Sequence, residues 1–287
     1  MTIFGVDVSA YQGQIDFAVL KTKAQFMYMR GAWAKNEDYY FQRNATEATG
    51  HGIPWGVYFV PTPGGAAKSW QVQADYHASL YQTFPGLLPP AIDLEQDGGM
   101  DKNDLGNWLE KYYAEFMMKS GAPEAMIYTR AGWFDYEMPL TNTFWRCLLW
   151  VADYTPPVSV PKEWSNHNRT YTLHQKGIYK PGSDYGCPEP PLAAAGIDLT
   201  DFPGTASQFQ DVFGVLPNPL PTTPPPTVGT RVRTKVAINP RTAPRVETAT
   251  DAGNINAGFT FKKAGEPQNG FQPVEVWLAQ AYLTELP

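Results

Sequence analysis

Two patterns of apolar and polar residues alternate along residues 3–213. Short apolar runs, typical of buried strands, occur at 3–8, 26–32, 55–60, 91–94, 125–129, 148–152, 170–174 and 196–199. Segments in which apolar residues recur every three or four positions predict helices at 16–23, 39–50, 66–84 and 102–120, with a short helix after Arg130. Asp101 is expected to cap the fourth helix and Gly121 to end it.

This alternation predicts an α/β fold built from βαβ units around a largely parallel sheet. After Trp150 the helical patterns fade, so about five βα units are followed by three nearly helix-free strands. We therefore expect an incomplete, modified (β/α) barrel of the TIM type.

A proline-rich stretch divides the chain. Six prolines fall within residues 217–226, and such a run favours extended polyproline II over helix or strand. Residues 228–287 carry 7 Lys and Arg against 5 Asp and Glu, whereas 15 basic and 23 acidic residues precede the stretch. Strand-like runs at 232–238, 258–263 and 274–278 predict a small all-β barrel. We expect an α/β domain at 1–216, a linker at 217–227 and an all-β domain at 228–287.

The charge and hydrophobicity of the chain bear on which kinds of partner it can bind. The chain has 22 Lys and Arg against 28 Asp and Glu, a net charge of −6, which argues against a nucleic-acid partner. No apolar run approaches the ~18 residues of a membrane span, and no basic residue precedes Lys21. We therefore expect neither membrane insertion nor a signal peptide. We also expect a monomer.

The cysteines and histidines carry little chemistry. Cys147 is expected to be a buried thiol and Cys187 a loop residue, and a disulfide between them stays open. The four histidines are scattered and are expected to have structural or surface roles. Because no His/Cys cluster has metal-ligand spacing, we expect no metal or cofactor.

Acidic residues gather where the predicted strands end, which is where the active site of a parallel β/α barrel lies. Asp7 ends the first strand, Asp93 and Glu95 end the fourth, Asp153 follows the sixth, and Asp198 ends the last. On a strand, Asp93 and Glu95 would point to the same face, about 7 Å apart. Taken singly, each Asp is more readily explained as the cap of a following helix or turn. Acids at four strand ends together favour a cluster.

Crowded carboxyls push their pKa values apart, which leaves one protonated and others ionised near neutral pH. Cleavage of a glycosidic bond needs such a pair. Aromatic side chains near the same strand ends would offer stacking faces to sugar rings, although each also fits ordinary core packing; they are Tyr11, Trp33, Tyr58, Tyr128, Trp150 and Tyr154. The sequence shows no nucleophilic triad elements and no phosphate-binding glycine loop, so glycan hydrolysis is the leading hypothesis.

Five segments carry a resemblance to a known family. They are Gly-Val-Asp-Val-Ser-Ala-Tyr-Gln-Gly-Gln-Ile-Asp-Phe at 5–17, Asp-Leu-Glu at 93–95, Ile-Tyr-Thr-Arg at 127–130, Leu-Trp-Val-Ala-Asp-Tyr at 149–154 and Ile-Asp-Leu-Thr-Asp-Phe at 197–202. In this order they resemble the glycoside hydrolase family 25 lysozymes, over about residues 3–213. The resemblance implies a modified (β/α) barrel that cleaves the β-1,4 bond between N-acetylmuramic acid and N-acetylglucosamine in peptidoglycan.

The resemblance also implies roles for single residues. Glu95 would be the proton donor, Asp93 and Asp198 would flank the reacting sugar, and Asp7 would complete the acidic floor. The family is described as retaining, and the nucleophile, an Asp or the 2-acetamido oxygen of the substrate, stays open. The expected substrate-binding residues are Tyr58, Tyr128, Trp150, Asp153, Tyr154 and Gln175.

Two segments depart from the family pattern. Arg-Gly-Ala-Trp-Ala at 30–34 stands where an Ala-Thr-Glu-Gly-like segment is usual, and Tyr-Phe-Val at 58–60 replaces a Tyr-His-Phe-like strand end. Since the acids remain, these departures bear on the sugar-binding subsites and on the preferred wall chemistry.

Residues 231–286 resemble bacterial SH3-like cell-wall modules, chiefly at 237–242 and in Val-Trp-Leu-Ala-Gln-Ala-Tyr-Leu at 276–283. A catalytic domain, a proline-rich linker and a wall-binding module form the layout of a phage or prophage endolysin. Such an enzyme is made in the host cytoplasm and reaches the wall through holin pores or lysis. Two alternatives stay open: a catalytically inactive glycan-binding or virion structural protein, and a hydrolase of another 2-acetamido sugar polymer such as chitin.

Overall fold

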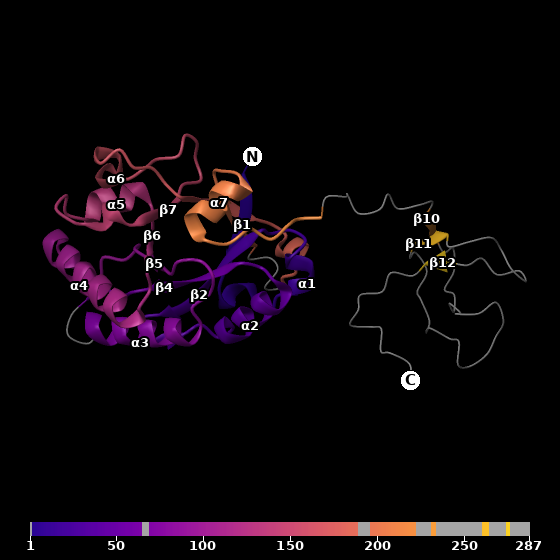
Figure 1. Cartoon of the computed structure of the whole chain (residues 1–287), viewed down its shortest axis with the longest axis horizontal. Helices are drawn as coiled ribbons and strands as arrows, with labels where there is room; N and C mark the ends of the chain where they lie inside the picture. Colours follow the sequence, from indigo (N-terminus) through magenta and orange to yellow (C-terminus); the bar gives the residue numbers. More distant parts are fainter. Residues whose placement is uncertain are drawn as a thin grey trace, which may run out of the picture. The chain divides into compact units, whose positions relative to one another are not determined.

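The computed structural model describes residues 2–64, 69–188 and 196–221 and three short strands nearer the C-terminus. The chain divides into two compact units, Met1–Leu220 and Pro221–Pro287. The larger unit is a mixed α/β barrel (Figure 1), as the alternating sequence pattern predicts.

Eight strands of the larger unit form a closed ring. In order around the barrel they are β1 (Ile3–Val8), β2 (Phe26–Trp33), β4 (Trp55–Val60), β5 (Ala91–Asp93), β6 (Met126–Thr129), β7 (Leu148–Ala152), β8 (Leu173–Tyr179) and β9 (Ile197–Phe202). β1 pairs in parallel with β2 and antiparallel with β9, so the sheet closes on itself. The expectation of a modified (β/α) barrel is confirmed, and its sheet is closed. The remaining strand of this sheet, β3 (Asn36–Glu37), pairs with the end of β2 outside the ring.

The last strand of the ring is reversed. β9 runs antiparallel to both β1 and β8. Its first residues, not its last, therefore lie at the carboxyl ends of the other strands. Asp198 is the second residue of β9 and faces Asp7 in the β1–β9 register. The expectation that Asp198 ends its strand is wrong, yet the reversal brings Asp198 to the same edge of the barrel.

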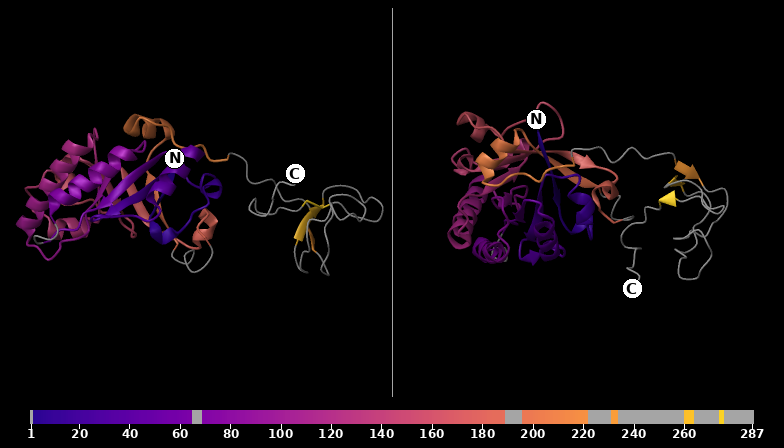
Figure 2. Two further views of the ribbon diagram at one scale, coloured as in Figure 1. Left: turned by 90° about the horizontal axis from the view of Figure 1, so that it is seen from below. Right: turned by 45° about the vertical axis from the view of Figure 1, so that its right-hand side comes forward.

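Helices cover the outer face of the barrel (Figures 1 and 2). Asp101 caps α4 through two backbone N–H groups and Gly121 ends α4 in the left-handed conformation, as expected. The sequence pattern missed α6 and α7. The helices are α1 (Phe17–Leu20), α2 (Phe41–His51), α3 (Trp70–Thr83), α4 (Lys102–Ser120), α5 (Ala131–Glu137), α6 (Lys162–Asn166) and α7 (Ala206–Phe213), with short 3-10 turns η1 (Ala10–Gln12), η3 (Phe144–Arg146) and η4 (Gly182–Tyr185).

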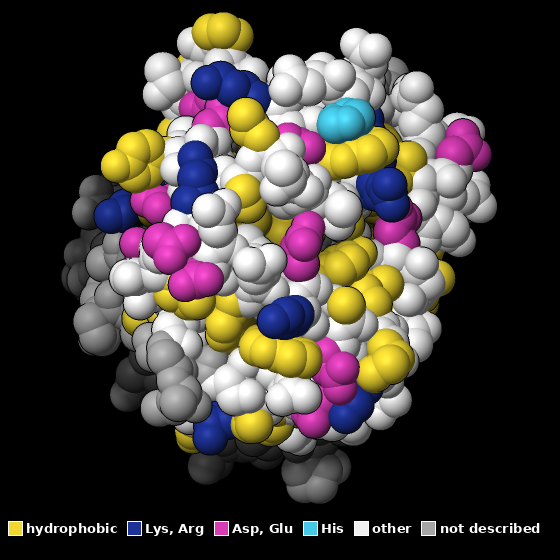
Figure 3. Space-filling view, turned by 90° about the vertical axis from the view of Figure 1, so that its left-hand side faces the viewer, with side chains coloured by type: hydrophobic (Ala, Val, Ile, Leu, Met, Phe, Trp, Pro, Cys, Tyr) yellow, Lys and Arg dark blue, Asp and Glu magenta, His cyan; other side chains and the backbone are white. Residues whose placement is uncertain are grey.

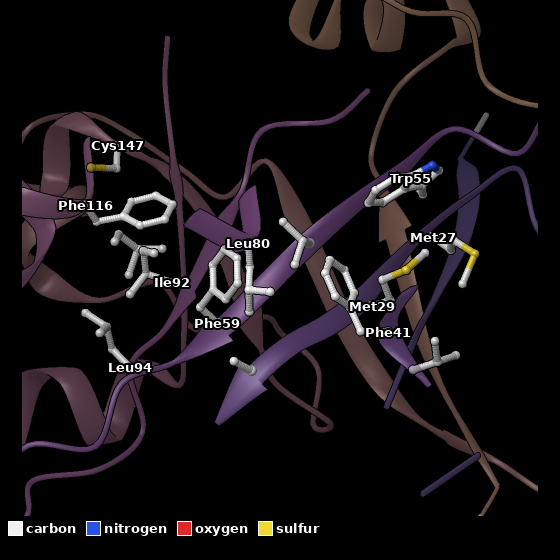
Figure 4. Close-up of a cluster of buried hydrophobic side chains, with 14 of the residues drawn as sticks. Met27, Met29, Phe41, Trp55, Phe59, Leu80, Ile92, Leu94, Phe116 and Cys147 are labelled. Carbon is white, nitrogen blue, oxygen red and sulfur yellow. The ribbon is translucent and has the colours of Figure 1, made fainter. Parts of the chain in front are cut away.

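Side chains of the strands alternate between two apolar layers. On β2, Met27 and Met29 belong to the layer between barrel and helices, whereas Phe26 and Tyr28 belong to the layer inside the barrel. In the outer layer, strand residues such as Ile92 pack near helix residues such as Phe116 (Figure 4). The inner layer is rich in aromatic rings, so the inside of the barrel is a packed core and not an open channel.

A buried histidine holds the loop that follows β2. His77 Nε2 lies 2.5 Å from the carbonyl oxygen of Ala34, whose φ of 51° is unusual for a residue with a side chain. Nε2 must donate to this carbonyl, so Nδ1 accepts from the Tyr112 hydroxyl 2.6 Å away. Burial lowers the pKa of His77 to about 3, so the ring is neutral. The expectation of a structural role is confirmed for this histidine.

The surface of the larger unit mixes charged and apolar side chains (Figure 3), and both of its cysteines are buried. None of the helices in the described part of the chain is long and apolar enough to cross a membrane. On the face in Figure 3, charged side chains of both signs are interspersed with apolar ones. Cys147 and Cys187 are buried free thiols, so the expectation for Cys147 is confirmed and the two form no disulfide.

The smaller unit contains a three-stranded antiparallel sheet of β10 (Arg231–Arg233), β11 (Thr260–Lys263) and β12 (Val274–Glu275). Each strand overlaps one of the three expected runs. The rest of the SH3-like expectation lies outside the described residues.

The first residues after α7 belong to the barrel unit. Pro217 and Asn218 are buried, although both lie in the proline-rich stretch. The Asn218 backbone N–H donates to the Gln25 carbonyl at 2.8 Å. Its side-chain amide donates to the carbonyls of Lys21 and Ala24 at 2.7 and 2.9 Å. These carbonyls precede β2, so the chain is fastened at the amino end of the barrel.

We expect Asn218→Ala to lower the free energy of unfolding of the barrel unit by about 1–3 kcal/mol, because two carbonyls lose their donor and one of them is buried. Urea unfolding followed by circular dichroism measures the change. Asn103→Ala, an exposed position on α4, is the matched control. Equal midpoints for both variants would show that the segment at 217–218 does not stabilise the barrel.

Candidate active site

The strand register brings acids and aromatic rings to one level near the carboxyl ends of the strands. Asp93 on β5 is level with Tyr128 on β6, which is level with Trp150 on β7. The neighbours of Asp7 and of Asp93 on either side in the sequence belong to the outer layer, so both Asp side chains point into the barrel. Glu95 follows β5 by two residues.

Asp7 is buried and accepts hydrogen bonds on both oxygens. Gln175 Nε2 lies 3.0 and 3.1 Å from the two oxygens, and Thr200 Oγ1 donates to Oδ2 at 3.1 Å. Burial raises the pKa of Asp7 well above its usual range and the Asp198 charge raises it further, while the Gln175 and Thr200 hydrogen bonds act in the opposite direction. Asp7 therefore has the donors that an anion needs in a site that disfavours charge.

Asp93 has a different environment. It is 9% exposed, and its Oδ1 is buried with no hydrogen-bond partner in the described part of the molecule. Burial raises the pKa of Asp93 well above its usual range, with the charges of Glu95 and Asp7 adding to the rise and Arg30 and Arg130 opposing it.

Glu95 and Asp198 complete the acidic cluster at the mouth of the barrel. Burial raises the pKa of Glu95, and the charge of Arg130 opposes this rise; Arg130 Nε lies 3.3 Å from Glu95 Oε1. Burial, followed by the charge of Glu95, raises the pKa of Asp198 to about 6. A carboxyl group that holds its proton near neutral pH can act as a general acid.

The aromatic residues predicted to bind substrate lie at different depths. Trp150 is 1% exposed, and its ring packs 4.8 Å from both the Tyr28 and the Tyr128 rings and 6.3 Å from the Tyr58 ring. Among the described residues its Nε1 donor has no partner. Tyr58, Tyr128 and Trp150 thus form the floor of the site, and Tyr154, 49% exposed, lies at the mouth.

The two polar residues predicted to bind substrate are engaged with the protein. Asp153 accepts backbone N–H groups of Thr155 and Ser159 at 3.0 and 2.8 Å, so it holds the turn that carries Tyr154. Gln175 is 4% exposed and binds Asp7. Its Oε1 accepts from the hydroxyls of Tyr128 and Tyr154 at 2.9 and 2.8 Å.

Two arginines belong to the site, although sequence reasoning assigned no role to either. Arg30 forms a 2.8 Å ion pair with the buried Asp38, and its guanidinium lies 5.4 and 5.9 Å from the ring centroids of Tyr11 and Trp33. A charged residue within an apolar strand was the available signal. Arg130, in the motif at 127–130, lies 5.9 Å from the Tyr154 ring centroid besides its pair with Glu95.

In the residues that the structure describes, no group of three or more His, Cys, Asp or Glu side chains is placed to hold a metal ion. The carboxyl groups have arginine, amide and hydroxyl partners.

Comparison with known proteins identifies the family. The model of the glycosyl hydrolases family 25 matches residues 6–177. The chain belongs to this family. The match includes Asp7, Asp93, Glu95 and Gln175, whereas Asp198 follows it.

Solved structures of a lysozyme, a muramidase and an endolysin are similar to the chain. A bacterial lysozyme from Streptomyces coelicolor is 23% identical, covers 74% of this chain and 96% of its own, and has a TM-score of 0.60. A muramidase from Acremonium alcalophilum is 26% identical over 73% of this chain and 98% of its own, with a TM-score of 0.58. The catalytic domain of an endolysin from bacteriophage P40 of Listeria monocytogenes is 17% identical over 75% and 98%, with a TM-score of 0.57. No curated protein sequence matches the chain significantly.

We expect Asp198→Asn to stabilise the protein at pH 7 by on the order of 1 kcal/mol, reduced by partial solvent screening. The pKa of Asp198 rises from 3.8 to about 6 in the folded state. Folding therefore favours its protonated form, and this contribution is present at low pH and lost as the pH rises through about 6. Asn keeps the neutral shape at every pH.

Urea unfolding at pH 5 and pH 7 measures this effect, with Asp211→Asn on α7 as an exposed control. A wild-type chain and an Asp198→Asn variant with the same pH dependence of stability would contradict the expectation.

Proposed function

We propose that this glycoside hydrolase is an N-acetylmuramidase that cleaves the β-1,4 bond between N-acetylmuramic acid and N-acetylglucosamine in bacterial peptidoglycan. The observation that carries the proposal is the group of four carboxyls at the mouth of a family 25 barrel, in which burial raises every pKa. Such a group supplies a proton and negative charge to the two sides of one glycosidic bond.

Glu95 is the proton donor in this proposal. Its side chain is 33% exposed, so it is open to substrate, while burial keeps its pKa raised. Asp93 and Asp198 flank the reacting sugar, and Asp7 lies below them. The reaction runs with retention, through an Asp nucleophile or through the 2-acetamido oxygen of the substrate.

Sugar rings would meet two kinds of surface. At the mouth, the exposed rings of Tyr11, Trp33 and Tyr154 offer stacking faces beside Arg30 and Arg130. On the floor, the Trp150 Nε1 donor is without a protein partner in the described residues and would bind an oxygen atom of the substrate. In this proposal Tyr58 and Tyr128 shape the floor beside it, and Asp153 and Gln175 act by holding Tyr154.

With the second unit included, we propose that the protein is an endolysin that acts on the cell wall as a monomer. It would reach the wall after release by holin or lysis. Residues 228–287 carry the net positive charge expected of a module that approaches an anionic wall. Tethering would raise the effective concentration of the barrel at its substrate.

We expect Glu95→Gln to lower hydrolysis of peptidoglycan at least ~10²-fold with the fold intact, because the general acid is lost. Release of soluble fragments from purified walls and circular dichroism measure the two quantities. Glu124→Gln, two residues before β6 at the amino end of the barrel, is the matched control.

Mass spectrometry of the released fragments identifies which glycosidic bond is cleaved. Muramic acid at the reducing end supports the muramidase. Products from chitin alone would favour the other 2-acetamido polymer, and no cleavage of either by the wild type would favour the inactive glycan-binding protein. Activity of Glu95→Gln within a few-fold of the wild type would remove Glu95 from the mechanism.

We expect a chain ending at Leu220 to hydrolyse soluble muropeptide oligomers as fast as the full chain, yet to clear intact cells more slowly. The end point retains the Asn218 contacts and removes the second unit. Turbidity of cell suspensions at low and high salt measures clearing, since charge-driven attachment weakens with salt. Equal clearing by both chains would show that residues 221–287 do not target the wall.

A further inference from the structure

Gln175 occupies the centre of the polar network below the carboxyl cluster. It lies on β8 and joins four other segments, because its side chain bonds to Asp7 on β1, Tyr128 on β6 and Tyr154 after β7, while Asp7 also bonds to Thr200 on β9. At 4% exposure it is buried. It is therefore placed to influence the acids without facing the solvent.

The Gln175 amide has its oxygen on the side of the two tyrosines and its NH₂ group on the side of Asp7. A tyrosine hydroxyl has one hydrogen to donate, and both Tyr128 and Tyr154 direct theirs to Oε1. In this orientation the NH₂ end of the amide faces Asp7, whose two oxygens lie 3.0 and 3.1 Å away. An acceptor surrounded by donors favours the ionised carboxylate, since a protonated oxygen would face an N–H group or a hydroxyl hydrogen.

Asp93 has the opposite surroundings. Its buried Oδ1 has no donor among the described residues, and a buried carboxylate oxygen without a donor is costly when ionised. If the cluster lacks one or more negative charges, the geometry thus favours charge on Asp7 and protons on the β5 side, at Asp93 and Glu95.

We propose that Gln175 is a positioning residue whose N–H donors stabilise the ionised form of Asp7. The proton of the cluster is then held by the carboxyls of the β5 side, Asp93 and Glu95. This inference rests on the proposed function, because the proton at Glu95 is the one that hydrolysis uses. Tyr128 and Tyr154 act through Gln175 by fixing the direction of its amide. Since Tyr154 is half exposed, the network also links the mouth of the barrel to its buried acid.

Two substitutions test the proposal through the pH profile of kcat/KM on soluble muropeptide oligomers. Gln175→Met keeps the volume of the side chain and removes its two N–H donors, so the pKa of Asp7 rises. We therefore expect the acidic limb of the profile to move to higher pH by about one unit, which lowers kcat/KM about tenfold at pH values below the limb. Gln175→Glu can still donate while protonated, but repels Asp7 once ionised. Its activity is therefore retained at low pH, and its alkaline limb moves to higher pH, because the added negative charge raises the pKa of the neighbouring general acid.

Lys176→Met is the matched control, because Lys176 is the next residue of β8 and pairs with Asp201 on the outside at 2.8 Å. We expect both limbs of its profile to stay at the wild-type values. If Gln175→Met and Gln175→Glu lower thermal stability and keep both wild-type limbs, Gln175 has a packing role only and the proposal fails.

A second measurement does not depend on activity. In the full chain labelled with ¹³C at aspartate carboxyls, the Asp7 signal is assigned by its loss in Asp7→Asn, and its titration midpoint is read by NMR. We expect a higher midpoint in Gln175→Met than in the wild type, and an unchanged midpoint would overturn the proposal. If the wild type cleaves no glycan at all, the proposed function fails, while this midpoint still decides whether Gln175 sets the ionisation of Asp7.

Discussion

The antiparallel pairing of β9 between β1 and β8 is the constraint on which the site depends. A parallel last strand would place its first residues at the opposite end of the barrel. The reversal brings Asp198 level with Asp7, and ring closure sets both across the mouth from Asp93 and Glu95. Closure of the ring therefore brings acids that lie far apart in sequence to one mouth of the barrel. The same closure leaves the barrel without exposed sheet edges.

Collecting four carboxyls in an apolar barrel costs stability, and the surrounding groups limit this cost unevenly. Gln175 and Thr200 donate to Asp7, and Arg130 pairs with Glu95. Arg30 is held by Asp38 and reaches Asp93 only through its field. Asp93 Oδ1 has no hydrogen-bond donor in the part of the chain that the structure describes. Among the described residues, this oxygen and the Trp150 Nε1 donor are the buried side-chain polar atoms without a partner, and they mark the part of the site that a substrate is best placed to complete.

Local sequence pattern predicted much of this architecture. Strand and helix periodicity gave the first six barrel strands and α4 with both of its caps, because those features depend on residues a few positions apart. Acids at strand ends predicted the cluster. The direction of β9 was beyond local pattern, because strand direction depends on pairing with β1 nearly two hundred positions earlier. The helix α7 was also missed, although Thr205 and Gln208 form a capping box that the sequence displays.

The anchor at Asn218 fixes where the rest of the chain departs. Its carbonyl partners precede β2, at the pole of the barrel opposite the acids. The chain therefore leaves the barrel at the end opposite the open mouth, so its point of departure does not obstruct the access of a long substrate to the acids.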